Sequence, residues 1–353
     1  MVGGTVPMSV FSPFRPRSRV SAPAWTFLCG RIAVAETRLL TNDEFLDLLR
    51  LPTVPAFVQR VRQVETYVEL PSPDDGSRAS RVIEEEYVRI VRRQALDSPD
   101  VSVAEAMLVS YAFAELRAFV RARALKQEPA ARSYAFFTEA ELDVLWNGSF
   151  PAWPELEETA APEFAEAVAG LRRTLSDCDS PAAVLDLALD RAELVHFLAR
   201  AERISSDFIR RWAREYVRLR AALAVIRARL LGEETETLER VFLAPPLGDE
   251  WLETLAAADP ARLDAALAKE FVAPDGSAVE VSRASIGKVA RLMDDHLTMK
   301  AREARMIIFG PERLFAYLWA LHVENLNLRL VAETIAVEAD RDLTRRRLRM
   351  SYV

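Results

Sequence analysis

The chain has 353 residues, half of them hydrophobic, and carries a formal net charge of −7. This acidic balance argues against a general nucleic-acid binder, because basic charge supplies most of the non-specific affinity for nucleic acids. Two cysteines, Cys29 and Cys178, suggest neither a disulfide framework nor a zinc cluster. No apolar run reaches the roughly 18 to 20 residues of a membrane-spanning helix. With only 11 glycines, the composition predicts an all-α fold.

The first part of the chain is expected to hold a leader and one helical unit. Residues 1–24 combine prolines, serines and glycines with arginines and have no apolar core, so we expect a disordered leader there. Helical periodicity begins at Trp25. The first helical unit is predicted over 25–153, with long helices at 78–96 and 103–125.

Two further units are expected beyond it. The second is predicted over 154–243, with a helix that opens at Pro181 and a long helix at 208–231. The third is predicted over 244–353. It contains another proline-initiated helix, at 260–271, and closes with two long helices.

A helical phrase recurs along the chain at a long and nearly constant spacing. Arg121 and Arg123 of the first copy recur as Arg227 and Arg229, a step of 106 residues from position 121 to position 227. A further step of the same length falls in the amphipathic segment 327–331. The repeat indicates three related helical units, which suits a scaffold better than a reaction vessel.

These arginines have two interpretations. Arginines at i and i+2 point to different parts of a helix, so their stems can cover apolar neighbours on an exposed flank. Alternatively, equivalent helix ends present charge to the carboxylates or helix-terminal carbonyls of a partner. The basic helix ends are Arg121, Arg123, Arg227 and Arg229, with a further basic run at 345–347.

Candidate chemistry is sparse. No histidine has a second at the i+3 or i+4 spacing of a helical metal site, so we expect structural roles for all three: His196, His296 and His322. Asp294 and Asp295 resemble the aspartate-rich helices of all-α isoprenoid-type synthases. Those sites need another carboxylate one helical turn on, where this chain has threonine and methionine at 298–299. We therefore expect no cofactor, no metal and no catalytic residue.

The C-terminal part carries the most specific motif. Gly310-Pro311-Glu312 opens a helix that continues through Tyr317-Leu318, and the phrase Glu324-Asn325-Leu326-Asn327-Leu328-Arg329-Leu330 follows. These phrases resemble motifs of the C subunit, called d in eukaryotes, of V-type and A-type rotary ATPases. The segment 31–40 looks like the first helix of that family. The resemblance covers about residues 25–353.

The resemblance implies three pseudo-repeated helical units in a funnel-like array. It implies a non-catalytic central-stalk subunit, peripheral on the cytoplasmic face of the membrane, that couples ATP-driven rotation to proton or sodium transport. The implied partners are the rotor-ring proteolipid and the central-shaft subunits, with membrane contact only through the ring. Glu324, Asn327 and Arg329 are the predicted polar cluster, either at an interface or as an internal network that orders the last helix.

The sequence leaves two alternatives open. One is an all-α metal-dependent enzyme of the isoprenoid-synthase type, with its metal at Asp294 and Asp295. The other is a helical adaptor unrelated to rotary machines.

Overall fold

The computed structural model describes residues 22–71, 76–124, 136–137, 142 and 181–353. In these residues thirteen α-helices and no strand occur, so the all-α prediction is confirmed. The predicted leader lies outside the described residues except for its last three positions, which belong to the first helix, α1 (Ala22–Glu36).

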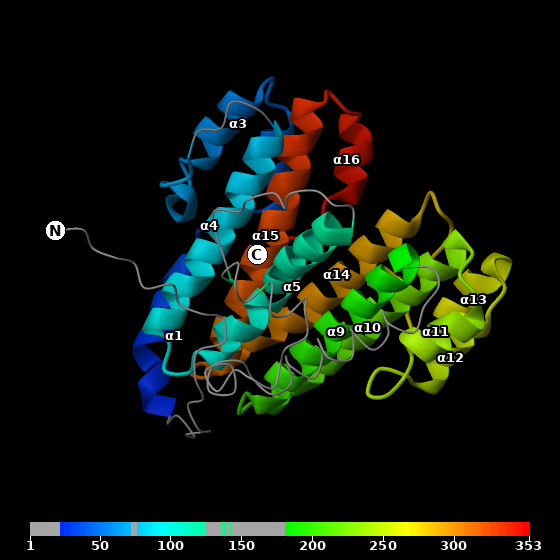
Figure 1. Cartoon of the computed structure of the whole chain (residues 1–353). Helices are drawn as coiled ribbons and strands as arrows, with labels where there is room; N and C mark the ends of the chain where they lie inside the picture. Colours follow the sequence, from blue (N-terminus) through cyan, green and yellow to red (C-terminus); the bar gives the residue numbers. More distant parts are fainter. Residues whose placement is uncertain (1–21, 72–75, 125–135, 138–141, 143–180) are drawn as a thin grey trace.

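Three hairpins of long helices form the framework (Figure 1). They are α4 (Gly76–Asp97) with α5 (Ser102–Ala124), α9 (Pro181–Arg203) with α10 (Asp207–Leu231), and α14 (Ile286–Arg302) with α15 (Pro311–Ala336). Their first helices begin at 76, 181 and 286, a step of 105 residues each time, and their second helices begin at 102, 207 and 311. The predicted helices at 78–96, 103–125 and 208–231 therefore match observed helices to within two residues.

Shorter helices complete the fold. They are α2 (Asn42–Leu49), α3 (Val54–Val61), α11 (Thr235–Val241), α12 (Glu250–Ala257), α13 (Leu263–Leu267) and α16 (Arg341–Arg347). The helix predicted over 260–271 is shorter in the structure, because a 3₁₀ turn at Pro260–Arg262 precedes α13.

Capping residues fix several of these helix ends. Thr41 and Glu44 form a reciprocal capping box at the start of α2, and the Ser206 hydroxyl accepts a hydrogen bond from a backbone N–H in the first turn of α10. Gly232 ends α10 with a φ of 95°, a left-handed conformation that glycine adopts without steric cost.

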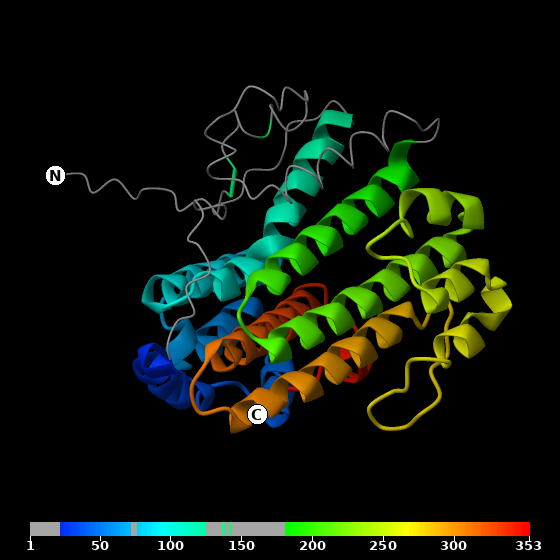
Figure 2. The ribbon, with the colours of Figure 1, turned by 90° about the horizontal axis from the view of Figure 1, so that it is seen from below.

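The hairpins pack against one another. α15 packs along α4 and also touches α1, α2, α5 and α14. Figure 2 shows α9, α10 and α14 side by side, and the short helices α11, α12 and α13 lie beyond α10. α5 joins the two groups because it contacts both α4 and α9. None of the helices in the described part of the chain is apolar over a length that would cross a bilayer.

An aromatic cluster marks the junction of three long helices. Trp212 of α10 meets both Phe315 and Trp319 of α15 edge to face, with ring centroids 4.7 Å apart in each pair. The indole N–H of Trp212 donates to the Leu297 carbonyl at 3.0 Å, and that of Trp319 donates to the Thr298 hydroxyl at 3.0 Å. Such geometries stabilise aromatic pairs beyond simple burial, so α10, α14 and α15 are held in a fixed relation.

Candidate functional site

Glu324 lies on α15 and is buried. Its carboxylate accepts a hydrogen bond from the Tyr67 hydroxyl at 2.6 Å and another from the Leu40 backbone N–H at 2.7 Å. Burial raises the pKa of Glu324 to about 7, although both hydrogen bonds act in the opposite direction. The side chain therefore joins α15 to the turn before α2 and to the short 3₁₀ helix Glu65–Tyr67.

Asn327 is fully buried one turn further along α15. Its side-chain amide donates to the Arg349 carbonyl at 3.0 Å and accepts from the Arg349 N–H at 2.9 Å. A single amide side chain thus pairs with both backbone groups of one residue, as a neighbouring β-strand would. Asn327 fixes the course of the chain after α16.

Arg329 faces α4. Its Nε donates to the Ser80 hydroxyl at 3.0 Å, and its guanidinium forms an ion pair with Glu84 at 2.5 Å. Ser80 in turn donates to Glu333, which lies one turn further along α15. These contacts link α4 and α15 through polar groups as well as through apolar packing.

The structure therefore does not bring Glu324, Asn327 and Arg329 together as one cluster. Each faces a different neighbour, and two of the three are buried. Their contacts are of the kind expected for an internal network that orders the last helix, which is one of the two roles predicted from the sequence. A role at an interface with another protein stays a prediction.

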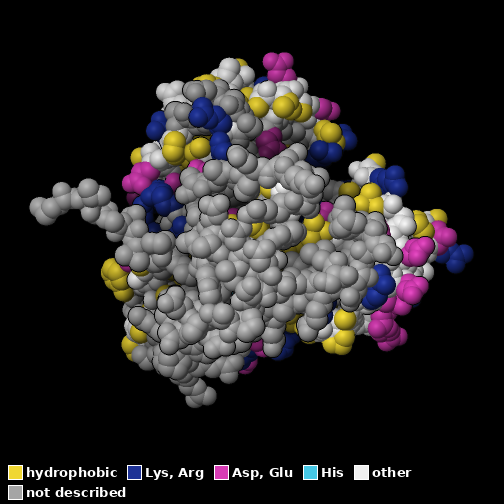
Figure 3. All heavy atoms as spheres, viewed as in Figure 1, with side chains coloured by type: hydrophobic (Ala, Val, Ile, Leu, Met, Phe, Trp, Pro, Cys, Tyr) yellow, Lys and Arg dark blue, Asp and Glu magenta, His cyan; other side chains and the backbone are white. Residues whose placement is uncertain are grey.

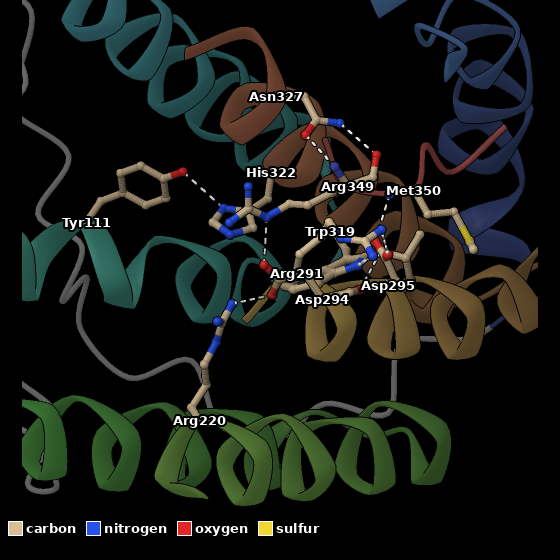
Figure 4. Close-up of polar contacts among 11 residues, drawn as sticks. Tyr111, Arg220, Arg291, Asp294, Asp295, Trp319, His322, Asn327, Arg349 and Met350 are labelled. Atoms are coloured by element: carbon tan, nitrogen blue, oxygen red, sulfur yellow. Dashed lines mark hydrogen bonds and ion pairs between the residues drawn. The ribbon is translucent and has the colours of Figure 1, made fainter. Parts of the chain in front are cut away.

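Asp294 of α14 lies between two arginines, as Figure 4 shows. One carboxylate oxygen pairs with Arg220 of α10 at 2.7 Å, and the other pairs with Arg349 at 2.7 Å. Burial alone would raise the pKa of Asp294, but the two guanidinium groups outweigh it and hold this pKa below its ordinary value. The side chain is therefore an ionised, doubly paired carboxylate in the interior.

Asp295 is also fully engaged by the protein. It accepts the Met350 backbone N–H at 2.7 Å and pairs with Arg291 at 3.0 Å. All four oxygens of Asp294 and Asp295 thus meet protein donors, and a cation there would face several guanidinium groups. In the described part of the chain, no group of three His, Cys, Asp or Glu side chains is arranged to hold a metal ion. The geometry gives this acidic pair a structural role.

Each of the three histidines contacts other residues of the chain. His322 lies within hydrogen-bond distance of the Tyr111 hydroxyl, at 3.0 Å, and burial lowers the pKa of its ring to about 3. His296 pairs with Glu215 at 3.1 Å. His196 is buried beside Phe113.

The basic helix ends are engaged within the chain to different degrees. Arg121 forms an ion pair with Asp186 of α9 at 2.7 Å. Arg229 donates to the carbonyls of Glu233 at 2.6 Å and Ala258 at 3.2 Å, so it satisfies backbone groups beyond its own helix end. Arg227 is exposed, and the side chain of Arg123 lies outside the described residues.

A corner at the start of α15 joins distant parts of the molecule. Gly310 has a φ of 152° and a ψ of 171°, a region open essentially to glycine alone. Its carbonyl accepts from the Cys29 thiol of α1 at 3.7 Å. Glu312 accepts from the Ser206 hydroxyl at 2.6 Å, and Arg313 forms a short ion pair with Glu36. The Gly-Pro-Glu motif therefore contacts both α1 and the second hairpin.

This corner lies within a region shared with known proteins. Residues 28–347 match the model of a family described as ATP synthase (C/AC39) subunit. The chain belongs to this family. It is the C/d stalk component of a V/A-type ATP synthase, and it is non-catalytic. No curated protein matches the chain.

Family membership confirms the resemblance drawn from the C-terminal motif and the prediction of a non-catalytic role. It decides against an isoprenoid-type enzyme and against an adaptor unrelated to rotary machines. Sequence reasoning missed several internal partners in this stalk protein, chiefly Arg220, Arg349 and Glu36. The recurring arginine phrase indicated three related helical units, but no sequence signal indicated which charges would meet.

Proposed function

We propose that this stalk protein couples the central shaft to the membrane rotor ring, so that rotation and proton or sodium transport proceed together. Its partners are the rotor-ring proteolipid and the central-shaft subunits, and it lies peripherally on the cytoplasmic face, touching the membrane only through the ring. The observation that carries this proposal is the family match over residues 28–347.

We also propose that the three hairpins are the cores of pseudo-repeated units in a funnel-like array, with units over 25–153, 154–243 and 244–353. The constant step of 105 residues between their first helices supports the repetition of the hairpins. So does the similar build of each hairpin, in which a long helix is followed closely by a second long helix.

Internal ion pairs suit a part that transmits torque. Such a part has to keep its hairpins in a fixed relation, and arginine–carboxylate pairs add geometric specificity to the apolar packing. Arg200 of α9 pairs with Glu105 of α5 at 3.0 Å, and both side chains are largely buried. Arg117 of α5 forms a second short ion pair, with Asp190 of α9. These pairs join the first hairpin to the second.

A tagged full-length chain, recovered from native membranes in mild detergent, tests the proposed partners. We expect catalytic ATPase subunits, shaft subunits and a small proteolipid to co-purify with it, as mass spectrometry would identify. Recovery of the chain free of all these subunits would contradict the proposal.

A further inference from the structure

A groove lies between α1 and α4. It has a volume of about 430 Å³, and Tyr317 of α15 contributes to its wall. Apolar side chains of Ile32, Ala35 and Ile90 line it as well. A cavity of this size accommodates several side chains of a bound partner.

Arginines dominate the charged lining. Among the residues that the structure describes, Arg31, Arg38 and Arg93 line the groove, together with one carboxylate, Glu65. The ion pair of Arg31 with Asp97, at 2.6 Å, and that of Arg38 with Glu65, at 2.6 Å, are both substantially exposed. Arg93 meets its exposed partner Glu69 only at 3.4 Å. Exposed pairs contribute about 0 to 1 kcal/mol, so an incoming carboxylate can replace these partners at little cost.

Exposed apolar side chains lie on the same segments of the chain as the residues that line the groove. Phe27 is 76% exposed and lies beneath the Arg31 guanidinium, and Val34, which lines the groove, is 53% exposed. Leu96 lies one turn beyond Arg93 and is 71% exposed. Val68 lies three residues beyond Glu65 and is 60% exposed. Figure 3 shows hydrophobic side chains at the lower left edge of the molecule, where Figure 1 places α1, and both basic and acidic side chains above them.

This combination favours one kind of occupant. A small anion would use the arginines but leave the exposed apolar side chains in water. An amphipathic helix with carboxylates on its flanks would cover the apolar residues and pair with the arginines on either side of the groove. We infer that the α1–α4 groove is a docking site for an acidic amphipathic helix of another protein in the complex, an inference that rests on the proposed function for the existence of such a partner.

Photo-crosslinking in intact cells tests this docking site. p-Benzoylphenylalanine replaces Val34 in the tagged full-length chain, and in a control chain it replaces Val272, an exposed valine of the α13 region. After irradiation, mass spectrometry maps the crosslinked peptide. We expect an adduct at position 34 with an acidic, helical segment of another protein.

Charge reversal adds a second readout. Arg38→Glu together with Arg93→Glu is expected to lower the yield of that adduct about tenfold or more, because attraction becomes repulsion at two contacts. Arg50→Glu, an exposed arginine of the α2–α3 turn, is expected to leave the yield unchanged. Thermal unfolding of each variant shows whether it remains folded.

Several outcomes would overturn the docking site. One is an adduct with lipid, with a second copy of this chain or with a neutral or basic segment. Another is an adduct yield that charge reversal does not change. A third is an adduct at position 272 alone. The same cells report on the proposed function separately. An acidic-helix adduct without co-purifying ATPase subunits would uphold the groove as a docking site and contradict the proposed coupling function, and ATPase subunits without the adduct would do the reverse.

Discussion

Asp294 and Glu324 are both buried carboxylates, but only Asp294 faces cations. Asp294 is paired with Arg220 and Arg349, whereas Glu324 accepts hydrogen bonds from a tyrosine and a backbone N–H. The pKa of Asp294 is accordingly lowered and that of Glu324 is raised. The two residues should respond in opposite ways to removal of their charge.

Replacing Asp294 by asparagine should destabilise the protein strongly. The change leaves two largely buried arginines without their carboxylate, and breaking a buried pair from one side costs about 3 to 5 kcal/mol. Asp47→Asn is the matched control, because Asp47 makes only an exposed ion pair with Arg50 and should cost less than about 1 kcal/mol. Urea unfolding at neutral pH measures the free energy of unfolding of both variants. Equal effects of the two substitutions would contradict the structural role of Asp294.

Glu324→Gln should change how stability depends on pH. An acid whose pKa is raised on folding binds protons more tightly in the folded state. Its contribution to the free energy of unfolding is therefore fully present below the unfolded value, near 4.5, and is lost as pH rises through about 7. Glutamine cannot ionise. Relative to the parent protein, the free energy of unfolding of the variant should rise by about 2 to 3 kcal/mol as the pH is raised from 5 to 8.

Urea unfolding at the two pH values measures this difference. Glu239→Gln, at an exposed position of α11, is the control and should show no such gain. If the parent protein and Glu324→Gln follow parallel pH profiles, Glu324 is not a buried carboxylate with a raised pKa.

The residue types of these sites could be read from the sequence, but their partners could not. Asp294 and Asp295 stand out in the sequence as an acidic pair, and a bound metal ion was the alternative considered for them. Arg220 lies 74 positions away from Asp294 and Arg349 lies 55 positions away. Only the packing of α10, α14 and the last residues of the chain brings these charges together. One sequence contains no record of which long-range pairs form.

At the scale of elements, sequence reasoning succeeded where local chemistry decides. The long helices α4, α5 and α10 were predicted almost to the residue, because apolar periodicity and helix-ending residues are local properties. The region of α13 was less predictable. Residues 260–271 have a helical pattern, but the chain there divides into a 3₁₀ turn, a five-residue helix and a non-helical segment.

The corner before α15 is the element most sensitive to a small change. Gly310 has a φ of 152°, which residues with a side chain rarely adopt, and a Cβ there would lie 2.1 Å from a Glu312 carboxylate oxygen, which would have to move. Gly310→Ala should therefore cost about 1 to 3 kcal/mol. Gly287→Ala is the matched control, because a Cβ there meets nothing within 4 Å and alanine favours the helix by up to about 1 kcal/mol. We expect the free energy of unfolding to fall for Gly310→Ala and to rise for Gly287→Ala. An equally mild effect at both sites would contradict the claim that the corner is strained.

At the scale of the whole molecule, residues far apart in the chain lie side by side. Residues after α16 contact α14, α15 and the start of α2, through Arg349, Met350 and Ser351. The Gly310 corner contacts α1 and the second hairpin. These contacts tie the third hairpin to α1, to α2 and to the second hairpin, as the proposed coupling role would require.

The coupling role is tested most directly by measuring ATP hydrolysis and ion uptake together in membrane vesicles from cells that lack this chain. We expect the catalytic subunits to hydrolyse ATP while the vesicles build no ion gradient, because the shaft and ring are no longer joined. Adding the purified chain back should restore ion uptake. Vesicles without the chain that still transport ions at the normal ratio to ATP hydrolysed would contradict the account.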